Sequence, residues 1–303
     1  MLRRPRLALL LGVSLLTGCT ASPSAETDRT LRAAVEAVLA DYPEATVAVA
    51  VRDPATDTRF DINTERVFHA ASTMKVPVMI EAFRRAGTEQ LGDSLTVRNE
   101  FRSIVDGSPF AITDDSDDTL YERIGERVPV QALLRRMITH SSNLATNLLI
   151  EHATADSVQQ TIERLGTERM RVLRGVEDLK AFDQGLSNTA TAADLATLLL
   201  ALMEGRAVSP SADSAMVAIL LDQSFDAMIP AGLPTDVRVA HKTGEITRIH
   251  HDAAIVYPDD APPYVLVVLT EGVDDHDRSA RLGAALARVV HTTLRGPAPL
   301  SDD

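Results

Sequence analysis

Much of the fold follows from residues 68–77, which read FHAASTMKVP. The apolar run after Lys75 predicts that a helix begins at Ser72. Side chains three residues apart share one helix face, so we expect Ser72 Oγ within hydrogen-bonding reach of Lys75 Nζ, as a nucleophile beside its base. The unpaired N–H groups of a helix start also favour developing negative charge. An N-capping serine followed by a surface lysine would give the same pattern.

Lysine is rare in this chain, and its positions are therefore informative. Of the 30 basic residues only three are lysine, namely Lys75, Lys180 and Lys242. Arginine keeps its proton in proteins, whereas a desolvated lysine can release it. Because a general base must be able to lose its proton, Lys75 and Lys242 indicate chemistry that arginine does not perform.

A second motif, Ser141-Ser142-Asn143, stands directly before an apolar helical segment. We expect Ser141 to relay a proton to a leaving group and Asn143 to hold a substrate amide. Serine and asparagine are also preferred helix N-caps, so capping alone would account for the motif.

A third motif, residues 241–244, reads HKTG, ends a predicted strand and precedes a predicted turn. Lys242 and Thr243 are expected to meet a substrate carboxylate. Gly244 is expected to let a substrate approach the backbone closely. A plain edge strand that runs into a glycine turn has the same features.

The hydrophobic pattern predicts an α/β (α+β) fold with strands from both ends of the chain in one antiparallel sheet. Strands are predicted over 45–52, 59–62, 237–242, 252–257 and 264–270. The stretch 73–204 is expected to be mainly helical, apart from a loop over 168–188. Clear helices are predicted over 30–39, 128–138, 142–151, 192–203, 211–221 and 279–294. The terminal helices should flank one face of the sheet, and the central helices should form an inserted all-helical domain.

The predicted domain boundaries follow these element types. We divide the chain into a signal peptide (1–18), a tether (19–27), an α/β domain in two parts (28–71 and 206–295), a helical domain (72–205) and a tail (296–303).

The first residues have the layout of a secretory signal. Three arginines precede the short apolar run 7–16, which is followed by Thr17-Gly18-Cys19. Residues 16–19 also resemble a bacterial lipobox, in which Cys19, the only cysteine of the chain, would be acylated. We therefore expect an exported, periplasmic protein that touches the membrane only through a lipid on Cys19. An ordinary signal peptide that happens to contain a cysteine is the alternative.

Composition excludes some partners. The net charge of −13 argues against nucleic-acid binding, which needs a basic face. Tryptophan is absent and aromatic residues make up 4% of the chain, which argues against a large aromatic platform for sugars or bases. We expect a monomer without cofactor.

The three motifs occur in one order and at wide separations: Ser-x-x-Lys, Ser-x-Asn and Lys-Thr-Gly. From residue 28 to residue 294 the chain resembles a class A serine β-lactamase, within the family of penicillin-recognising serine hydrolases. The resemblance implies that Ser72 attacks the carbonyl while Lys75 takes its proton, directly or through water. It also implies an oxyanion hole from the backbone N–H groups of Ser72 and Glu245, and assistance from Ser141 and Lys242 in protonating the lactam nitrogen.

The same resemblance implies a set of substrate-binding residues. Asn143 would bind the acylamide side chain. Thr243 and Thr247 would bind the carboxylate, beside Gly244. The chain departs from the family at Ser142, where the family usually has aspartate.

The loop that carries the deacylating glutamate in this family is reshaped here. The family reads Glu-x-x-Leu-Asn, whereas residues 174–180 read RGVEDLK. Glu177 is our candidate to activate the deacylating water, with Asp178 and Asp183 as rivals and a solvated surface acid as the alternative. Lys180 stands near the place of the family's water-holding asparagine.

These features leave three functions open. The first is a β-lactamase, the second a D-alanyl-D-alanine peptidase or another serine amidase or esterase acting on a peptidoglycan-like peptide, and the third a β-lactam-binding protein that stays acylated. The arginine that usually assists carboxylate binding is not evident, with Arg248 and His250 as weak candidates. The run His250-His251-Asp252 lacks the spacing of a metal site, so no metal is predicted.

Overall fold

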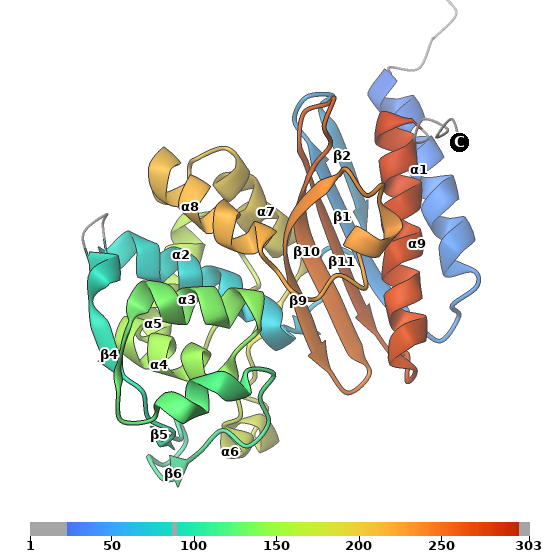
Figure 1. Ribbon diagram of the computed structural model, residues 1–303. Coiled ribbons are helices and arrows are strands. Elements are labelled where there is room, and N and C mark those ends of the chain that lie inside the picture. Colours follow the sequence, from blue (N-terminus) through green and yellow to red (C-terminus); the bar gives the residue numbers. More distant parts are fainter. Residues whose placement is uncertain (1–22, 87–89, 297–303) are drawn as a thin grey trace, which may run out of the picture.

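The computed structural model describes residues 23–86 and 90–296, and its centre is a five-stranded antiparallel sheet (Figure 1). The strand order is β2-β1-β11-β10-β9. The strands are β1 (Thr46–Asp53), β2 (Thr58–Ile62), β9 (Arg238–Ile246), β10 (Ile249–Tyr257) and β11 (Tyr264–Glu271). Strand β1 pairs with β11 and strand β9 is an edge, so the two ends of the chain build one sheet.

Both faces of the sheet are covered. Helices α1 (Pro23–Leu39) and α9 (His276–Arg295) lie side by side on one face (Figure 1). Along β1, Val47, Val49 and Val51 belong to the apolar cluster under these two helices. Ala48 and Ala50 point the other way, into the cluster shared with the helical part. This alternation is the period of two that a strand buried on both faces requires.

The helical part is inserted between β2 and β9. Its helices are α2 (Lys75–Ala86), α3 (Val130–Thr139), α4 (Asn143–Ala153), α5 (Ala155–Arg164), α6 (Leu179–Asp183), α7 (Ala192–Met203) and α8 (Pro210–Leu221). Short strand pairs join β3 (Phe68–His69) to β8 (Thr189–Ala190), β4 (Ser94–Thr96) to β7 (Arg127–Pro129) and β5 (Phe101–Arg102) to β6 (Pro109–Phe110). The 3-10 turns are η1 (Ala71–Met74), η2 (Gln90–Gly92), η3 (Asp118–Arg123) and η4 (Pro230–Gly232).

The predicted antiparallel sheet with two terminal helices on one face is confirmed. Three details were wrong. Residues 127–129 form strand β7, so the helix predicted from residue 128 begins at Val130. The predicted loop 168–188 contains the short helix α6. The stretch 73–204 also includes five short strands, which apolar spacing alone did not reveal because each has only two or three residues.

The loop 168–188 is fastened at both ends by buried amide and carboxylate groups. Asp194 in α7 accepts hydrogen bonds from the backbone N–H groups of residues 168–170. Near the other end, Asn188 Oδ1 accepts from Leu173 N and Arg174 N, and Asn188 Nδ2 donates to the Arg174 carbonyl. Buried backbone groups need such partners, and these side chains supply them at both ends of the loop.

In residues 23–86 and 90–296, no helix combines the length and the apolar character needed to cross a membrane.

Candidate active site

The side chain of Ser141 lies between two lysine ammonium groups. Lys75 Nζ donates to Ser141 Oγ over 3.1 Å, and Lys242 Nζ donates to the same oxygen over 3.2 Å. Lys75 Nζ also donates to the Ser141 carbonyl at 2.7 Å and to Asn143 Oδ1 at 2.9 Å, and Lys242 Nζ donates to the Thr243 carbonyl at 2.9 Å. Helix α2, the start of α4 and strand β9 thus meet at one hydroxyl group.

Both lysines are fully buried, and burial changes their protonation. Burial lowers the pKa of Lys75 well below its usual value, and the neighbouring Lys242 lowers it further, against Asp115 and Glu177. Burial lowers the pKa of Lys242 to about 7, against Asp252. A low-dielectric site disfavours the charged amine, so burial favours the neutral form of Lys75, which is the form that accepts a proton.

Ser72 does not begin the α-helix as predicted, because it precedes the first residue of α2. It lies in the 3-10 turn η1, and helix α2 begins only at Lys75. The predicted hydrogen bond between Ser72 and Lys75 is also wrong, since among the residues described here Lys75 Nζ bonds to Ser141 and Asn143 instead. Three oxygens, two on Ser141 and one on Asn143, therefore surround the amine.

Gly244 brings strand β9 against the turn that carries Ser72. A Cβ atom at Gly244 would lie 3.0 Å from Ser72 N and 3.1 Å from both Thr73 N and Thr73 Cγ2. Gly244 was expected to let a substrate come close to the backbone. In the structure, the backbone of Ser72 and Thr73 already lies against it. The absence of a side chain at this position keeps β9 next to Ser72.

Three non-glycine residues at the site have left-handed backbone angles. These are Ala71 (φ 44°), directly before Ser72, Ser141 (φ 56°) and Glu177 (φ 59°). Such conformations cost on the order of 1–3 kcal/mol each and persist only where the surroundings impose them. Three of the seven non-glycine residues with positive φ in the described chain therefore lie at or beside the predicted site.

The second motif, residues 141–143, both caps helix α4 and contacts a lysine of the candidate site. Ser142 is buried and caps α4, since its Oγ accepts from Ala145 N over 3.3 Å. The side chain of Asn143 contacts Lys75. Capping and chemistry therefore fall on neighbouring residues of one motif.

Asp115 is a site residue that the sequence analysis missed. Its carboxylate accepts from Asn143 N and Leu144 N, each at 2.8 Å, and from the Tyr121 hydroxyl at 3.0 Å. It thus holds the first turn of α4, and it favours the charged form of Lys75. Asp115 belongs to the acidic run 114–118, which has the composition of a solvated loop. The one signal in the sequence was Ser142, which stands where the family usually has aspartate, so a carboxylate from another segment could accept from the first N–H groups of α4.

Glu177 lies next to the same asparagine. Glu177 Oε1 accepts from Asn143 Nδ2 over 3.4 Å, and Oε2 accepts from Thr113 N at 2.8 Å and Thr113 Oγ1 at 3.1 Å. The preceding peptide is fixed to α4, because Asn147 donates to the Val176 carbonyl and accepts from Val176 N. The loop therefore brings Glu177, alone among the three predicted acids, toward Lys75.

The rival acids have other surroundings. Asp178 is buried and caps α6, accepting from Ala181 N, Ser103 Oγ and Ile104 N. Asp183 is exposed at the end of α6. Lys180 is exposed, and its amine pairs with Asp106 at 2.9 Å and donates to Ser108 Oγ at 2.6 Å.

Strand β9 continues past the third motif. The turn predicted after Gly244 is wrong, because β9 runs to Ile246 and pairs with β10 along its whole length. Thr243 is buried, Glu245 is exposed, and Thr247 lies exposed in the turn to β10. The carboxylate-binding roles of the two threonines and the oxyanion role of the Glu245 N–H stay predictions.

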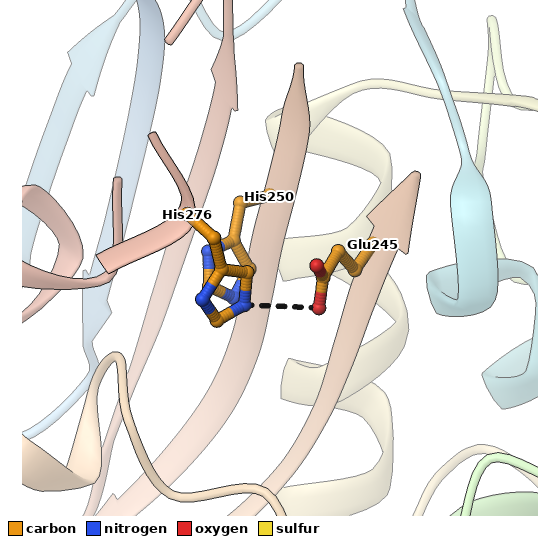
Figure 2. Close-up of side chains that lie close together, drawn as sticks. All are labelled: Glu245, His250 and His276. Carbon is orange, nitrogen blue, oxygen red and sulfur yellow. Dashed lines mark ion pairs between the residues drawn. The ribbon is translucent and has the colours of Figure 1, made fainter. Parts of the chain in front are cut away.

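The basic residues downstream are engaged elsewhere. Arg248 pairs with Asp274 at 2.9 Å on the surface. His251 is buried, accepts from Thr270 N and contacts the His69 carbonyl, so it is not free to bind a ligand. His250 lies with Glu245 and His276 in a group whose side chains suit a metal ion (Figure 2).

Comparison with known proteins identifies relatives over almost the whole described chain. Residues 30–294 match the family described as "Beta-lactamase enzyme family". A beta-lactamase of Bacillus licheniformis is 24% identical over 279 residues, covering 89% of this chain and 87% of that protein. The crystal structure of a beta-lactamase from Sphaerobacter thermophilus has a TM-score of 0.75 at 28% identity, covering 89% of this chain and 99% of that one. The structure of PBP-A has a TM-score of 0.76 at 24% identity, covering 88% of this chain and 96% of that chain.

The contact at Gly244 gives a stability prediction. Gly244→Ala should lower the free energy of unfolding by about 1–3 kcal/mol, because the added methyl overpacks the space between β9 and the Ser72 turn. Urea unfolding followed by circular dichroism measures the change. Gly92→Ala is the matched control, since a Cβ there meets nothing within 4 Å. Equal unfolding midpoints for the two variants would contradict the prediction.

Proposed function

The chain belongs to the beta-lactamase enzyme family, and from this premise we propose that it hydrolyses β-lactams through an acyl-enzyme on Ser72. The observation that carries the proposal is the Ser141 hydroxyl, held between the buried amines of Lys75 and Lys242. This arrangement offers a proton acceptor, a relay and a second amine within one hydrogen-bonded chain.

Acylation uses these groups in order. Neutral Lys75 takes the proton of Ser72, directly or through water, as the serine oxygen attacks the lactam carbonyl. The N–H groups of Ser72 and Glu245 stabilise the oxyanion. When the tetrahedral intermediate collapses, the carbonyl–nitrogen bond breaks and the nitrogen needs a proton. Ser141 donates its hydroxyl proton to that nitrogen and is reprotonated by Lys75 or Lys242.

Deacylation requires a second base. A water molecule must lose a proton as it attacks the ester, and of the three predicted acids only Glu177 contacts Asn143 and favours the charged form of Lys75. Asn143 donates to Glu177 and accepts from Lys75, so it links the two bases. Attack on the ester releases Ser72 and the opened lactam acid, and the proton returns to the serine oxygen.

A second candidate function is slow-turnover β-lactam binding. Glu177 Oε2 already accepts two hydrogen bonds from Thr113, and the Lys180 amine pairs with Asp106. These two bonds occupy the lone pairs of Oε2, so this oxygen is not open to a water molecule. If Glu177 is inactive for this reason, the protein acylates on Ser72 and holds the adduct.

We predict that Ser72→Ala abolishes acylation without unfolding the chain, because no other serine stands three residues before a lysine and beside Gly244. Intact mass spectrometry with benzylpenicillin over a time course measures it. The control is Ser214→Ala, an exposed serine on α8, which should behave as the unchanged protein. An opened-lactam mass on the Ser72 variant would assign the nucleophile elsewhere.

Glu177→Gln should keep fast acylation and accumulate adduct, with turnover slowed by roughly 10²–10⁴-fold, the usual contribution of a general base. Stopped-flow hydrolysis of a chromogenic cephalosporin gives both rates. Asp183→Asn is the exposed control and should leave both rates unchanged. Unchanged turnover in Glu177→Gln would remove Glu177 from the mechanism. An adduct that persists for hours on the unmutated protein would favour the binding function.

The pKa of Lys242 gives a pH prediction. Because burial lowers it to about 7, the ammonium is charged below that pH and neutral above it. Attraction of a substrate carboxylate to Lys242 is therefore lost as the pH rises, and KM for benzylpenicillin should increase across pH 7. Steady-state kinetics measure KM against pH. In Lys242→Arg the charge persists, so KM should not rise with pH; a parallel rise in this variant would contradict the role of Lys242.

We further propose that the protein is exported to the periplasm and acts there as a monomer tethered by a lipid on Cys19. This residue lies outside the described part of the chain. Expressed in a bacterium, the full chain should partition into detergent phase and incorporate labelled palmitate, whereas Cys19→Ser should do neither. Equal partitioning of the two proteins would contradict the lipid anchor.

A further inference from the structure

Three ligating side chains meet beside the end of strand β9. Glu245 on β9 and His250 on β10 are direct cross-strand partners, and His276 is the first residue of α9. One ligand atom of each residue lies within 4.8 Å of the others. Figure 2 shows the two imidazole rings over one another, with the Glu245 carboxylate facing them.

His250 lacks the hydrogen bonds that a buried imidazole normally has. It is only 6% exposed, its Nδ1 is buried without a partner, and neither ring nitrogen bonds to another residue in the described part of the chain. Its ring is held by stacking on His276, with centroids 4.6 Å apart and planes 24° apart. Buried polar atoms without partners are uncommon in folded proteins and need an explanation.

His276 already has the surroundings of a metal-binding histidine. Its Nε2 lies 3.1 Å from Glu245 Oε2, and its Nδ1 lies 3.5 Å from Asp277 Oδ1. Histidines that bind metals usually direct their second nitrogen to a carboxylate, which fixes the ring. A simple His276–Glu245 ion pair would explain this contact, but it would leave His250 unexplained.

The charges nearby favour a cation. Glu245 and Asp277 supply two carboxylates. The nearest basic group on the adjoining turn, Arg248, is paired with Asp274 and the Gly272 carbonyl. A divalent cation would therefore balance the negative charge of Glu245 and Asp277.

We propose that Glu245, His250 and His276 bind one divalent transition-metal ion. Two imidazoles and one carboxylate suit Zn²⁺, whose protein ligands lie about 2.0–2.2 Å from the metal. Glu245 and His276 are each about half exposed, so their side chains can turn to close the 4.8 Å spread around buried His250. Three protein ligands leave an open position on a tetrahedral ion.

The open position has a consequence that rests on the proposed function. Glu245 follows directly after Thr243 and Gly244, the predicted binding residues for the substrate carboxylate. A Zn²⁺ ion at the cluster would attract that carboxylate where the chain lacks an evident arginine. Substrate and metal binding should then strengthen each other.

The test is a Zn²⁺ titration of the untagged, EDTA-treated full chain by isothermal calorimetry. The unchanged protein and the control His152→Ala, an exposed histidine on α4, should each bind one Zn²⁺ at this site. His276→Ala and Glu245→Gln, both at exposed positions, should bind it more than about tenfold more weakly. All four proteins keep Cys19, so its thiol affects them equally, and circular dichroism checks that each is folded.

Absence of this Zn²⁺ binding in the unchanged protein, or equal binding by the folded His276→Ala variant, would overturn the proposal. The coupling is measured separately as KM for benzylpenicillin, which should fall when Zn²⁺ is added to the unchanged protein and stay constant in His276→Ala. A KM indifferent to Zn²⁺ would overturn the coupling alone. Absence of any β-lactam hydrolysis would overturn the proposed function, while the calorimetry would still report the metal site.

Discussion

Two fully buried lysines that share one serine hydroxyl impose the main constraint on this structure. Lys75 and Lys242 both donate to Ser141 Oγ, in a site where each positive charge is costly. The site moderates this cost with carboxylates at a distance, Asp115 from one side and Asp252 from the other. Asp252 is itself held by His241 and by the Ile229 N–H. Burial thus has the largest effect on how readily each amine gives up its proton, and the carboxylates behind the lysines act against it.

Most of the candidate site could be predicted from the sequence, because the chemistry of the site depends on residue types that others cannot replace. The scarcity of lysine, together with the motifs around Ser72 and Gly244, pointed to Lys75 and Lys242, and both are buried at the centre of the site. The sheet was predictable because long apolar strands have a clear period. Contacts between distant segments were not predictable. Lys75 was expected to face Ser72, three residues away, yet its amine reaches Ser141 and Asn143, more than sixty residues later.

Asp115 illustrates a second limit of the sequence. The family resemblance predicts an aspartate inside the second motif, and the chain has Ser142 there. In the structure, Ser142 caps α4 from within, and Asp115 supplies a carboxylate to the same helix start from the loop before η3. The electrostatic need of the helix start is met by a residue from another segment. A sequence motif specifies an aspartate at one position. The helix start needs only a carboxylate close to its N–H groups, and Asp115 supplies it from another segment.

The pairing of β1 with β11 has a consequence for how the chain reaches its native fold. Strand β1 has only β2 as a partner until residues 264–271 are synthesised, so an interior strand of the sheet waits for a segment far later in the chain. The helical part, built from contacts nearer in sequence, can form while β1 is still open on one side. Pairing between segments so far apart closes a very long loop and is slow to form. During synthesis this protein therefore exposes an apolar strand edge until β11 emerges, which is a period of vulnerability to aggregation.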